Sequence, residues 1–147
     1  ATGQLKRASG EGWKQVSVVM SGLSGSVQMI LGRDGKVYLT EAAGKVQAID
    51  PRDWSRKTVA EGLALPEGLA QRENGALVVA EAGARRIVEI DLSTGSRRVL
   101  AQNLPIGFEA GPGLPPSYVP TGVAVARDGT VYFSADRNNG IYRLPVR

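Results

Sequence analysis

Acidic side chains recur at one position of a pattern that the chain repeats. Glu41 and Glu81 each follow a short apolar segment, and Glu67 opens another such segment, between a proline and a glycine. Asp136 and Asn138 lie just after the corresponding apolar segment near the end of the chain. Carboxylate and amide oxygens are the ligands that hard divalent cations prefer, so these positions indicate a cation site if the fold brings them to one face.

Each of these residues also has a structural interpretation. Glu67 as a metal ligand or general base competes with a solvated carboxylate at the start of a strand. Glu41 and Glu81 could line a cation-binding rim, or they could cap neighbouring loop amides and pair with a nearby arginine. The Asp-Arg-Asn-Asn-Gly segment at 136–140 is equally typical of a turn.

Histidine and cysteine are absent from the 147 residues. Their absence excludes a Ser-His-Asp triad, thiol nucleophiles, thiolate metal sites and disulfides, and it leaves the redox compartment undetermined. Any chemistry must therefore use carboxylates, amides, hydroxyls or lysine. The net charge is +4, but the basic residues are spread in short pairs and aromatic residues are only 5% of the chain. No nucleic-acid partner is expected, because such a surface needs concentrated positive charge and stacking aromatics.

An internal repeat of about forty residues determines how the acidic side chains are positioned. Each copy begins with two short apolar strands, joined by a tight turn at Asp34-Gly35, Asn74-Gly75 or Asp128-Gly129. A third strand follows in each copy and a fourth follows in two of them, at 46–49, 87–90, 141–144, 57–60 and 98–101. Each full unit is therefore four antiparallel strands with both faces largely apolar, which predicts a sheet that is covered on both sides.

A β-propeller with four-stranded blades explains this period best. A sandwich or an up-and-down barrel also uses short strands with regular turns, but neither explains a repeat of about forty residues. The chain is therefore predicted to be all-β, with residues 1–147 forming a single propeller segment of about three blades. The expected blade parts, with an inserted loop at about 105–119, are 1–23, 24–63, 64–104 and 117–147.

The two ends of the chain are expected to be complementary. Residues 17–23 match the fourth strand of the other copies and residues 5–8 the strand before it, whereas the last copy stops after its third strand. Propellers typically have four to eight blades, so three blades leave two apolar faces uncovered. We expect a second copy to complete the ring about a two-fold axis, which makes a homodimer, or the remaining half of the same propeller to do so.

Two stretches carry a resemblance to a known superfamily. Residues 66–70 read Pro-Glu-Gly-Leu-Ala, and residues 120–133 read Pro-Thr-Gly-Val-Ala-Val-Ala-Arg-Asp-Gly-Thr-Val-Tyr-Phe. They are similar to the blade openings of the gluconolactonase (senescence marker protein) and NHL-repeat superfamily, and residues 136–141 resemble the NHL continuation. The resemblance covers nearly the whole chain and implies half of a six-bladed ring, but it identifies a fold more than an activity.

The gluconolactonase-like members of this superfamily imply a specific chemistry. It is lactone hydrolysis by a divalent cation, such as calcium, which Glu, Asn and Asp side chains hold in the central channel. The position after the blade-motif proline holds Glu67 and Thr121 in two copies, and Val27 in the first. Glu67 matches an oxygen-donor ligand, Thr121 departs from the pattern and Val27 cannot coordinate, so an intact site would need ligands from elsewhere. A related propeller lyase relies on histidine, which this chain lacks.

The inserted loop would cross the same face as the acidic residues. Long loops without regular structure tend to be binding loops or lids, although a surface loop or a channel plug is the alternative. The sequence thus favours a module that binds a ligand or a protein, with a metal-dependent lactonase-like hydrolase as the alternative, and leaves open whether the chain is an enzyme. The expected binding face comprises Glu41, Glu81, Phe108, Tyr118, Thr121, Asp136 and Asn138.

Composition is typical of a turn-rich globular protein. Apolar residues make up 42% and charged residues 22%, with 19 glycines and 8 prolines. No stretch approaches the roughly 18 to 20 apolar residues of a membrane-spanning helix. A soluble chain without a membrane partner is expected, and its compartment is undetermined, with an extracytoplasmic location left open.

Overall fold

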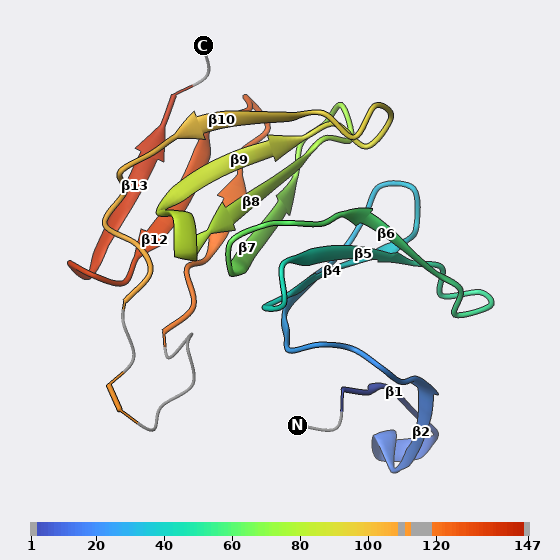
Figure 1. Ribbon diagram of the computed structural model, residues 1–147. Helices are drawn as coiled ribbons and strands as arrows, with labels where there is room; N and C mark the ends of the chain where they lie inside the picture. The colour runs from blue at the N-terminus through green and yellow to red at the C-terminus, as the bar shows by residue number, and fades with distance from the viewer. Residues whose placement is uncertain (1–2, 109–110, 113–118, 146–147) are drawn as a thin grey trace.

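The computed structural model describes residues 3–108, 111–112 and 119–145, which form thirteen strands in four antiparallel sheets (Figure 1). Two sheets have four strands each, and their strands are β3 (Ser26–Leu31), β4 (Val37–Glu41), β5 (Lys45–Ile49), β6 (Arg56–Ala60), β7 (Pro66–Gln71), β8 (Leu77–Glu81), β9 (Arg86–Ile90) and β10 (Arg97–Ala101). Two sheets are partial, and their strands are β1 (Leu5–Ser9), β2 (Gln15–Met20), β11 (Val123–Val125), β12 (Val131–Ala135) and β13 (Gly140–Leu144). Short 3₁₀ turns occur at η1 (Glu11–Trp13) and η2 (Ala82–Ala84). The predicted all-β class is confirmed.

Tight turns join the first and second strands of three sheets, as the sequence predicts. In each turn the Asp or Asn side chain accepts a hydrogen bond from the backbone N–H two residues later, at 2.9 to 3.2 Å. The following glycine has a positive φ, which is +79° at Gly35 and +89° at Gly75. Glycine adopts this conformation without a steric penalty, so these dipeptides set the register of each hairpin.

The β1–β2 hairpin has the register of the outer hairpins in the complete sheets. In all three hairpins the outer strand skips one residue at the same place, next to the pairs Leu5 with Met20, Val46 with Ala60, and Ile87 with Ala101. Such a β-bulge increases the local twist and bends the strand pair. The shared bulge identifies β1 and β2 as the third and fourth strands of a sheet to which no first or second strand is joined among the described residues.

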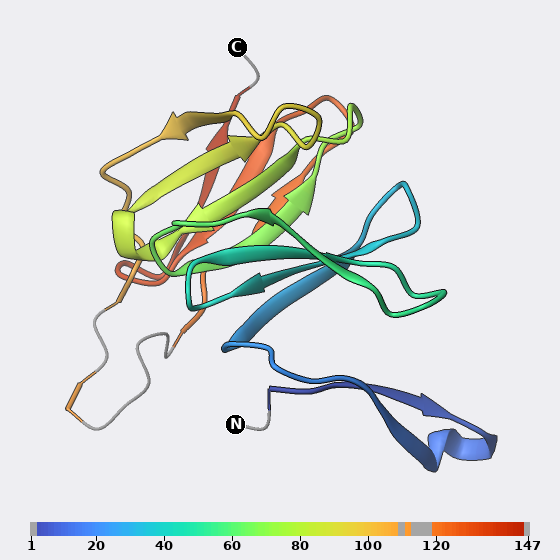
Figure 2. The ribbon, with the colours of Figure 1, turned by 45° about the vertical axis from the view of Figure 1, so that its right-hand side comes forward.

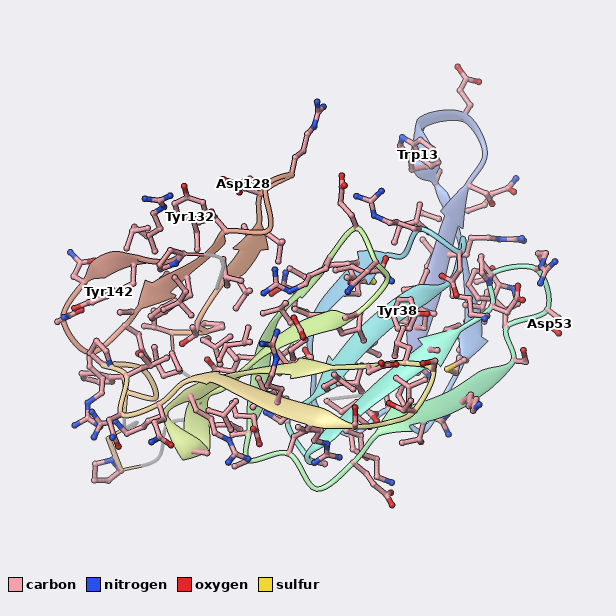
Figure 3. The ribbon with its side chains drawn as sticks, turned by 90° about the horizontal axis from the view of Figure 1, so that it is seen from above. Trp13, Tyr38, Asp53, Asp128, Tyr132 and Tyr142 are labelled. Carbon is pink, nitrogen blue, oxygen red and sulfur yellow. The ribbon has the colours of Figure 1, made fainter. Side chains whose placement is uncertain are left out.

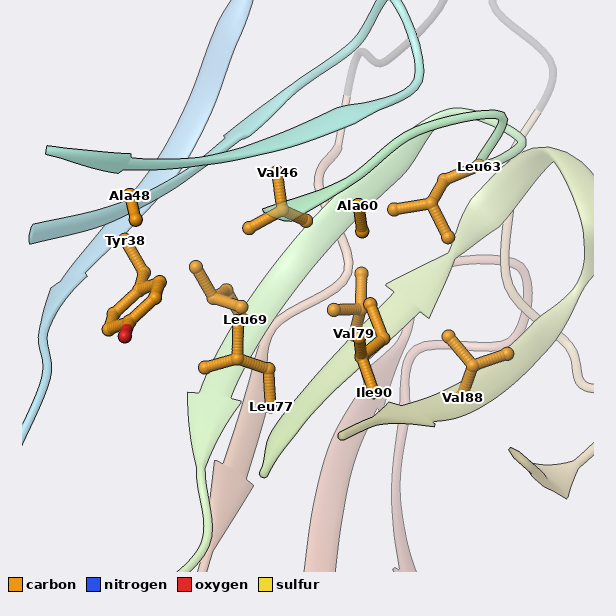
Figure 4. Close-up of a cluster of buried hydrophobic side chains, with 10 residues drawn as sticks. All are labelled: Tyr38, Val46, Ala48, Ala60, Leu63, Leu69, Leu77, Val79, Val88 and Ile90. Atoms are coloured by element: carbon orange, nitrogen blue, oxygen red, sulfur yellow. The ribbon is translucent and has the colours of Figure 1, made fainter. Parts of the chain in front are cut away.

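The sheets pack face to face along an arc, with the first strands β3, β7 and β11 next to one another (Figures 1 and 2). One core cluster lies between the two complete sheets, where Tyr38 and Val46 face Leu69 and Leu77 (Figure 4). A second cluster joins the β7–β10 sheet to the β11–β13 sheet around Phe133. A third and smaller cluster joins β1–β2 to the β3–β6 sheet. Burial of these apolar faces holds the sheets together.

No helix in the described part of the chain is long and apolar enough to cross a membrane.

Candidate functional site

Glu41 and Glu81 hold the loops that lead into their own sheets. Both carboxylates are buried, and each accepts a hydrogen bond from a loop amide: Glu41 Oε1 from Ser24 N at 2.6 Å, and Glu81 Oε1 from Ala64 N at 2.9 Å. The second oxygen of each carboxylate is bonded by a side chain of the third strand, at 2.6 and 2.5 Å, from Gln47 and Arg86 respectively. The loop capping and arginine pairing that the sequence suggested as the structural role are therefore present.

The third copy uses a different connection. Pro105 occupies the loop position equivalent to Ser24 and Ala64, and proline has no N–H to donate. The backbone N–H of Phe108 donates instead to Asp136 Oδ2 at 2.7 Å. The other oxygen, Oδ1, is buried without a hydrogen-bond partner in the described structure. Two predicted face residues, Phe108 and Asp136, are thus brought together, and Phe108 is 49% exposed.

Glu67 connects two neighbouring sheets. It lies at the start of β7 and is 2% exposed, so the alternative of a solvated carboxylate is wrong. Its Oε2 accepts a hydrogen bond from the backbone N–H of Thr121 at 2.6 Å, in the segment that leads into β11. The Thr121 hydroxyl is buried and has no hydrogen-bond partner within the described ranges.

Gln28 has the matching role one sheet earlier, and it was not among the residues predicted from the sequence. Its Nε2 donates to the carbonyl of Leu69 at 3.2 Å, and its Oε1 accepts from the N–H of Leu69 at 3.1 Å. The side-chain amide therefore joins β3 to β7. The only sequence signal is that the equivalent positions in the other copies are Gly68 and Gly122, where no side chain can reach across.

Asn138 lies apart from these connections. Asn138 is in the turn between β12 and β13, where its Nδ2 donates to the hydroxyl of Tyr142 at 2.6 Å. Tyr118 lies outside the described residues. Of the residues predicted for one face, Glu41, Glu81 and Asp136 each accept a hydrogen bond from the backbone of a loop.

The described residues do not by themselves fit the divalent cation that the family resemblance implies. They contain no group of three histidine, cysteine, aspartate or glutamate side chains that could hold a metal. At the blade-motif position, Glu67 and the Thr121 hydroxyl offer oxygen atoms, but Val27 offers none.

A hollow lies at the opposite ends of the strands, between the two complete sheets. It has a volume of about 890 Å³, and its lining includes Asp34, Tyr38 and Leu92. Burial and the hydrogen bond to Asp34 raise the pKa of Tyr38 to about 12. The lining contains four basic and four acidic residues, Asp34 among them, so its charge does not select a class of ligand.

Comparison with known proteins identifies the fold. No protein-family model matches the chain, and no curated protein matches it in sequence. Solved structures do match: a chain of the nidogen/laminin complex aligns with a TM-score of 0.71 and 19% identity, over 89% of this chain and 47% of that one. Virginiamycin B lyase from Staphylococcus aureus aligns at 0.63 and 22%, over 88% and 42%, and a gluconolactonase from Xanthomonas campestris at 0.66 and 20%, over 86% and 46%.

These matched proteins are six-bladed β-propellers. The chain therefore has the β-propeller fold in four-stranded antiparallel blades, as predicted, and it spans less than half the length of the propellers that it matches. In chain order we name the sheets the first blade (β1–β2), second blade (β3–β6), third blade (β7–β10) and fourth blade (β11–β13). The matched structures include both a protein–protein complex and enzymes, so the fold does not select a function.

Proposed function

We propose that this chain is a β-propeller binding module that works as part of a completed ring and is not itself an enzyme. The observation that carries the proposal is the use of its acidic side chains. Glu41, Glu67 and Glu81 are buried, and each accepts a backbone N–H from a loop or from the next blade. A catalytic carboxylate must reach a substrate or a metal, whereas these carboxylates hold the backbone in place.

The proposed binding face is the side on which loops enter the blades. Its connections at 22–25, 62–65 and 104–108 are anchored by acidic side chains. Loops that are already ordered lose little conformational entropy when they bind. The half-exposed ring of Phe108, whose backbone is fixed by Asp136, is the aromatic anchor that we expect at this face. One matched propeller chain comes from a complex of two proteins, nidogen and laminin, which supports a role in protein binding.

The partial blades support the proposal that the ring is completed. The first blade has two strands and the fourth has three in the described chain. Strand edges and apolar faces that remain open in a propeller are sites of association. The binding face is therefore expected to continue onto blades that complete the arc.

A divalent-metal-dependent, gluconolactonase-like hydrolase is the second candidate. One observation favours it: the buried Thr121 hydroxyl has no hydrogen-bond partner in the described structure, and it belongs to the residue whose N–H bonds Glu67. Additional ligands from completing blades would be required.

Two measurements on one sample separate these candidates. The first is the thermal unfolding midpoint with calcium and with EDTA, and the second is the hydrolysis rate of δ-gluconolactone. We expect equal midpoints and no hydrolysis above the uncatalysed rate. A calcium-dependent rise in the midpoint that Glu67→Gln removes, together with lactone hydrolysis, would overturn the proposal in favour of the hydrolase.

A further inference from the structure

The fourth blade leaves apolar residues exposed that are buried in the other blades. Ile141 in β13 is 76% exposed, whereas Val46 at the same repeat position is fully buried. Tyr132 in β12 is 40% exposed, whereas its counterpart Tyr38 is 3% exposed in the core between the second and third blades. Figure 3 shows Tyr132 at the outer end of the arc. A neighbouring blade is needed to cover this face.

The second blade exposes the opposite half of the same interface. Met29 in β3 is 60% exposed, whereas Leu69 at the equivalent position in β7 is 1% exposed and packs in one cluster with Tyr38. In the described chain, therefore, the fourth blade exposes the face that Tyr38 occupies in the contact between the second and third blades. The second blade exposes the face that Leu69 occupies in the same contact. A second copy, placed by a two-fold axis, would bring Tyr132 of each copy onto Met29 of the other.

The strand count shows what such a ring requires. Two copies carry 26 strands in their described residues, whereas six four-stranded blades hold 24. The two surplus strands are third strands. Both β1 and β13 correspond in register to the third strands β5 and β9, so each copy carries one third strand more than its share of the ring needs. Among the described residues, the fourth blade has no fourth strand, and β2 is the fourth strand whose own blade is incomplete.

We propose that a second copy of this chain closes the ring by strand exchange: β2 of one copy pairs with β13 of the other, and β13 takes the place of β1. This inference rests on the ring completion in the proposed function and names the partner. Ile141 would then occupy the position of Leu5, which lies against the small core cluster of Leu39 and Ile49. A groove of about 680 Å³ also opens beside the end of β13, between β10 and β12.

The residues of the competing strands favour the exchange. At the two middle positions β1 has Lys6 and Arg7, whereas β13 has Tyr142 and Arg143, so β13 brings one cation fewer and one large aromatic ring more. β2 carries no charged residue, unlike β6 and β10, which each begin with two cations. An uncharged fourth strand can pair with Arg143 without like-charge repulsion.

The shared register predicts which residues meet. Arg7 lies opposite Ser17 within the first blade. Applying the same register, with its bulge, to the exchanged pair places Arg143 opposite Ser17 of the other copy. Directly opposed residues of antiparallel strands have Cα atoms about 4.5 to 5.5 Å apart, which is within the range that a disulfide can bridge.

A cysteine competition tests the proposal, because the chain contains no cysteine of its own. The triple variant Arg7→Cys, Ser17→Cys and Arg143→Cys lets residue 17 choose between its partner in the same chain and its partner in the second copy. After mild oxidation, we expect most of the protein to run as a covalent dimer on a non-reducing gel. Peptide mass spectrometry should find the 17–143 disulfide and a free thiol at residue 7.

The control variant Ser17→Cys with Arg127→Cys places the second thiol in the exposed turn before β12. On the same non-reducing gel it should run as a single chain. If this control formed as much covalent dimer as the triple variant, the pairing of β2 with β13 of the other copy would be overturned. The native mass of the unmodified chain accompanies the gel, so the test does not depend on the variants folding. A dimer with a 7–17 disulfide would overturn the exchange and leave ring completion standing, whereas a folded monomer with that disulfide would overturn both.

Discussion

The carboxylate of Glu67 accepts a hydrogen bond from the backbone N–H of Thr121 at 2.6 Å, although 54 residues separate them in the chain. They occupy the same repeat position in successive blades. Glu67 therefore holds the entry of the fourth blade against the first strand of the third. Gln28 holds the third blade against the second in the same way.

Removal of the Glu67 side chain should weaken the connection between the third and fourth blades. Glu67→Ala leaves the N–H of a buried residue without this acceptor, so we expect a loss of about 1 to 3 kcal/mol in the free energy of unfolding. Glu67→Gln keeps an acceptor oxygen and should lose less. Urea denaturation measures both, with the exposed Glu61→Ala as the matched control. Equal stability of Glu67→Ala and the control would show that the connection contributes nothing.

Replacement of the Gln28 side chain should destabilise the protein by a similar amount. Gln28→Leu has a similar size but leaves both the N–H and the carbonyl of Leu69 without their side-chain partner. We expect destabilisation of about 1 to 3 kcal/mol in the same denaturation assay. Gln4→Leu, in an exposed position near the start of the chain, should change stability little. A larger loss of stability in Gln4→Leu than in Gln28→Leu would contradict this role for Gln28.

The strands were predictable because their signals are local, whereas the connections between blades are not. Asp34-Gly35 and the alternating apolar residues around it specify one hairpin without reference to the rest of the chain. The bulge in β1–β2 depends on which N–H pairs with which carbonyl across two strands, and the sequence does not state that pairing. Gln28 reads as an ordinary strand residue until β7 is placed beside it.

The candidate site was predictable only in part, for the same reason. The repeated positions of Glu41 and Glu81 indicated a common role, and their hydrogen bonds in the structure show that this role is loop capping. The partner atoms were not predictable, since Ser24 and Ala64 are about seventeen residues away from these carboxylates in the chain. The repeat could not predict the bond between Phe108 and Asp136, because the position of Asp136 holds Ala42 and Ala82 in the other copies.

Acid should weaken the third blade through Glu89. Burial raises the pKa of this carboxyl, but hydrogen bonds and charge from Arg98 and Arg72 outweigh that effect and hold the pKa below its usual value. A lowered pKa in the folded state means that the ion pairs stabilise the fold above the unfolded value of about 4.3, and that this contribution disappears as the pH falls through the folded value. Glu89→Gln should therefore lower the thermal midpoint at pH 7 and reduce its dependence on pH below about 4.3. If the thermal midpoint of Glu89→Gln depended on pH as that of the unmodified chain does, the stabilising role of the Glu89 ion pairs would be contradicted.

Gly68 lies where the third and fourth blades come closest. A Cβ at this position would lie 2.4 Å from the carbonyl oxygen of Thr121, which is backbone and cannot move aside like a flexible side chain. We expect Gly68→Ala to destabilise the protein by about 1 to 3 kcal/mol, as overpacking does in a dense core. Urea denaturation again provides the measure. Higher stability, the usual result of Gly→Ala at an unstrained site, would show that the blades are not held this closely.

The native mass of the unmodified chain, from size exclusion with light scattering, tests ring completion most directly. The account predicts a folded particle of about twice the 15.5 kDa chain mass, in which Tyr132 and Ile141 are covered by a second copy. A stable, well-folded particle of 15.5 kDa would contradict it, because the apolar faces of the second and fourth blades would then be tolerated in water.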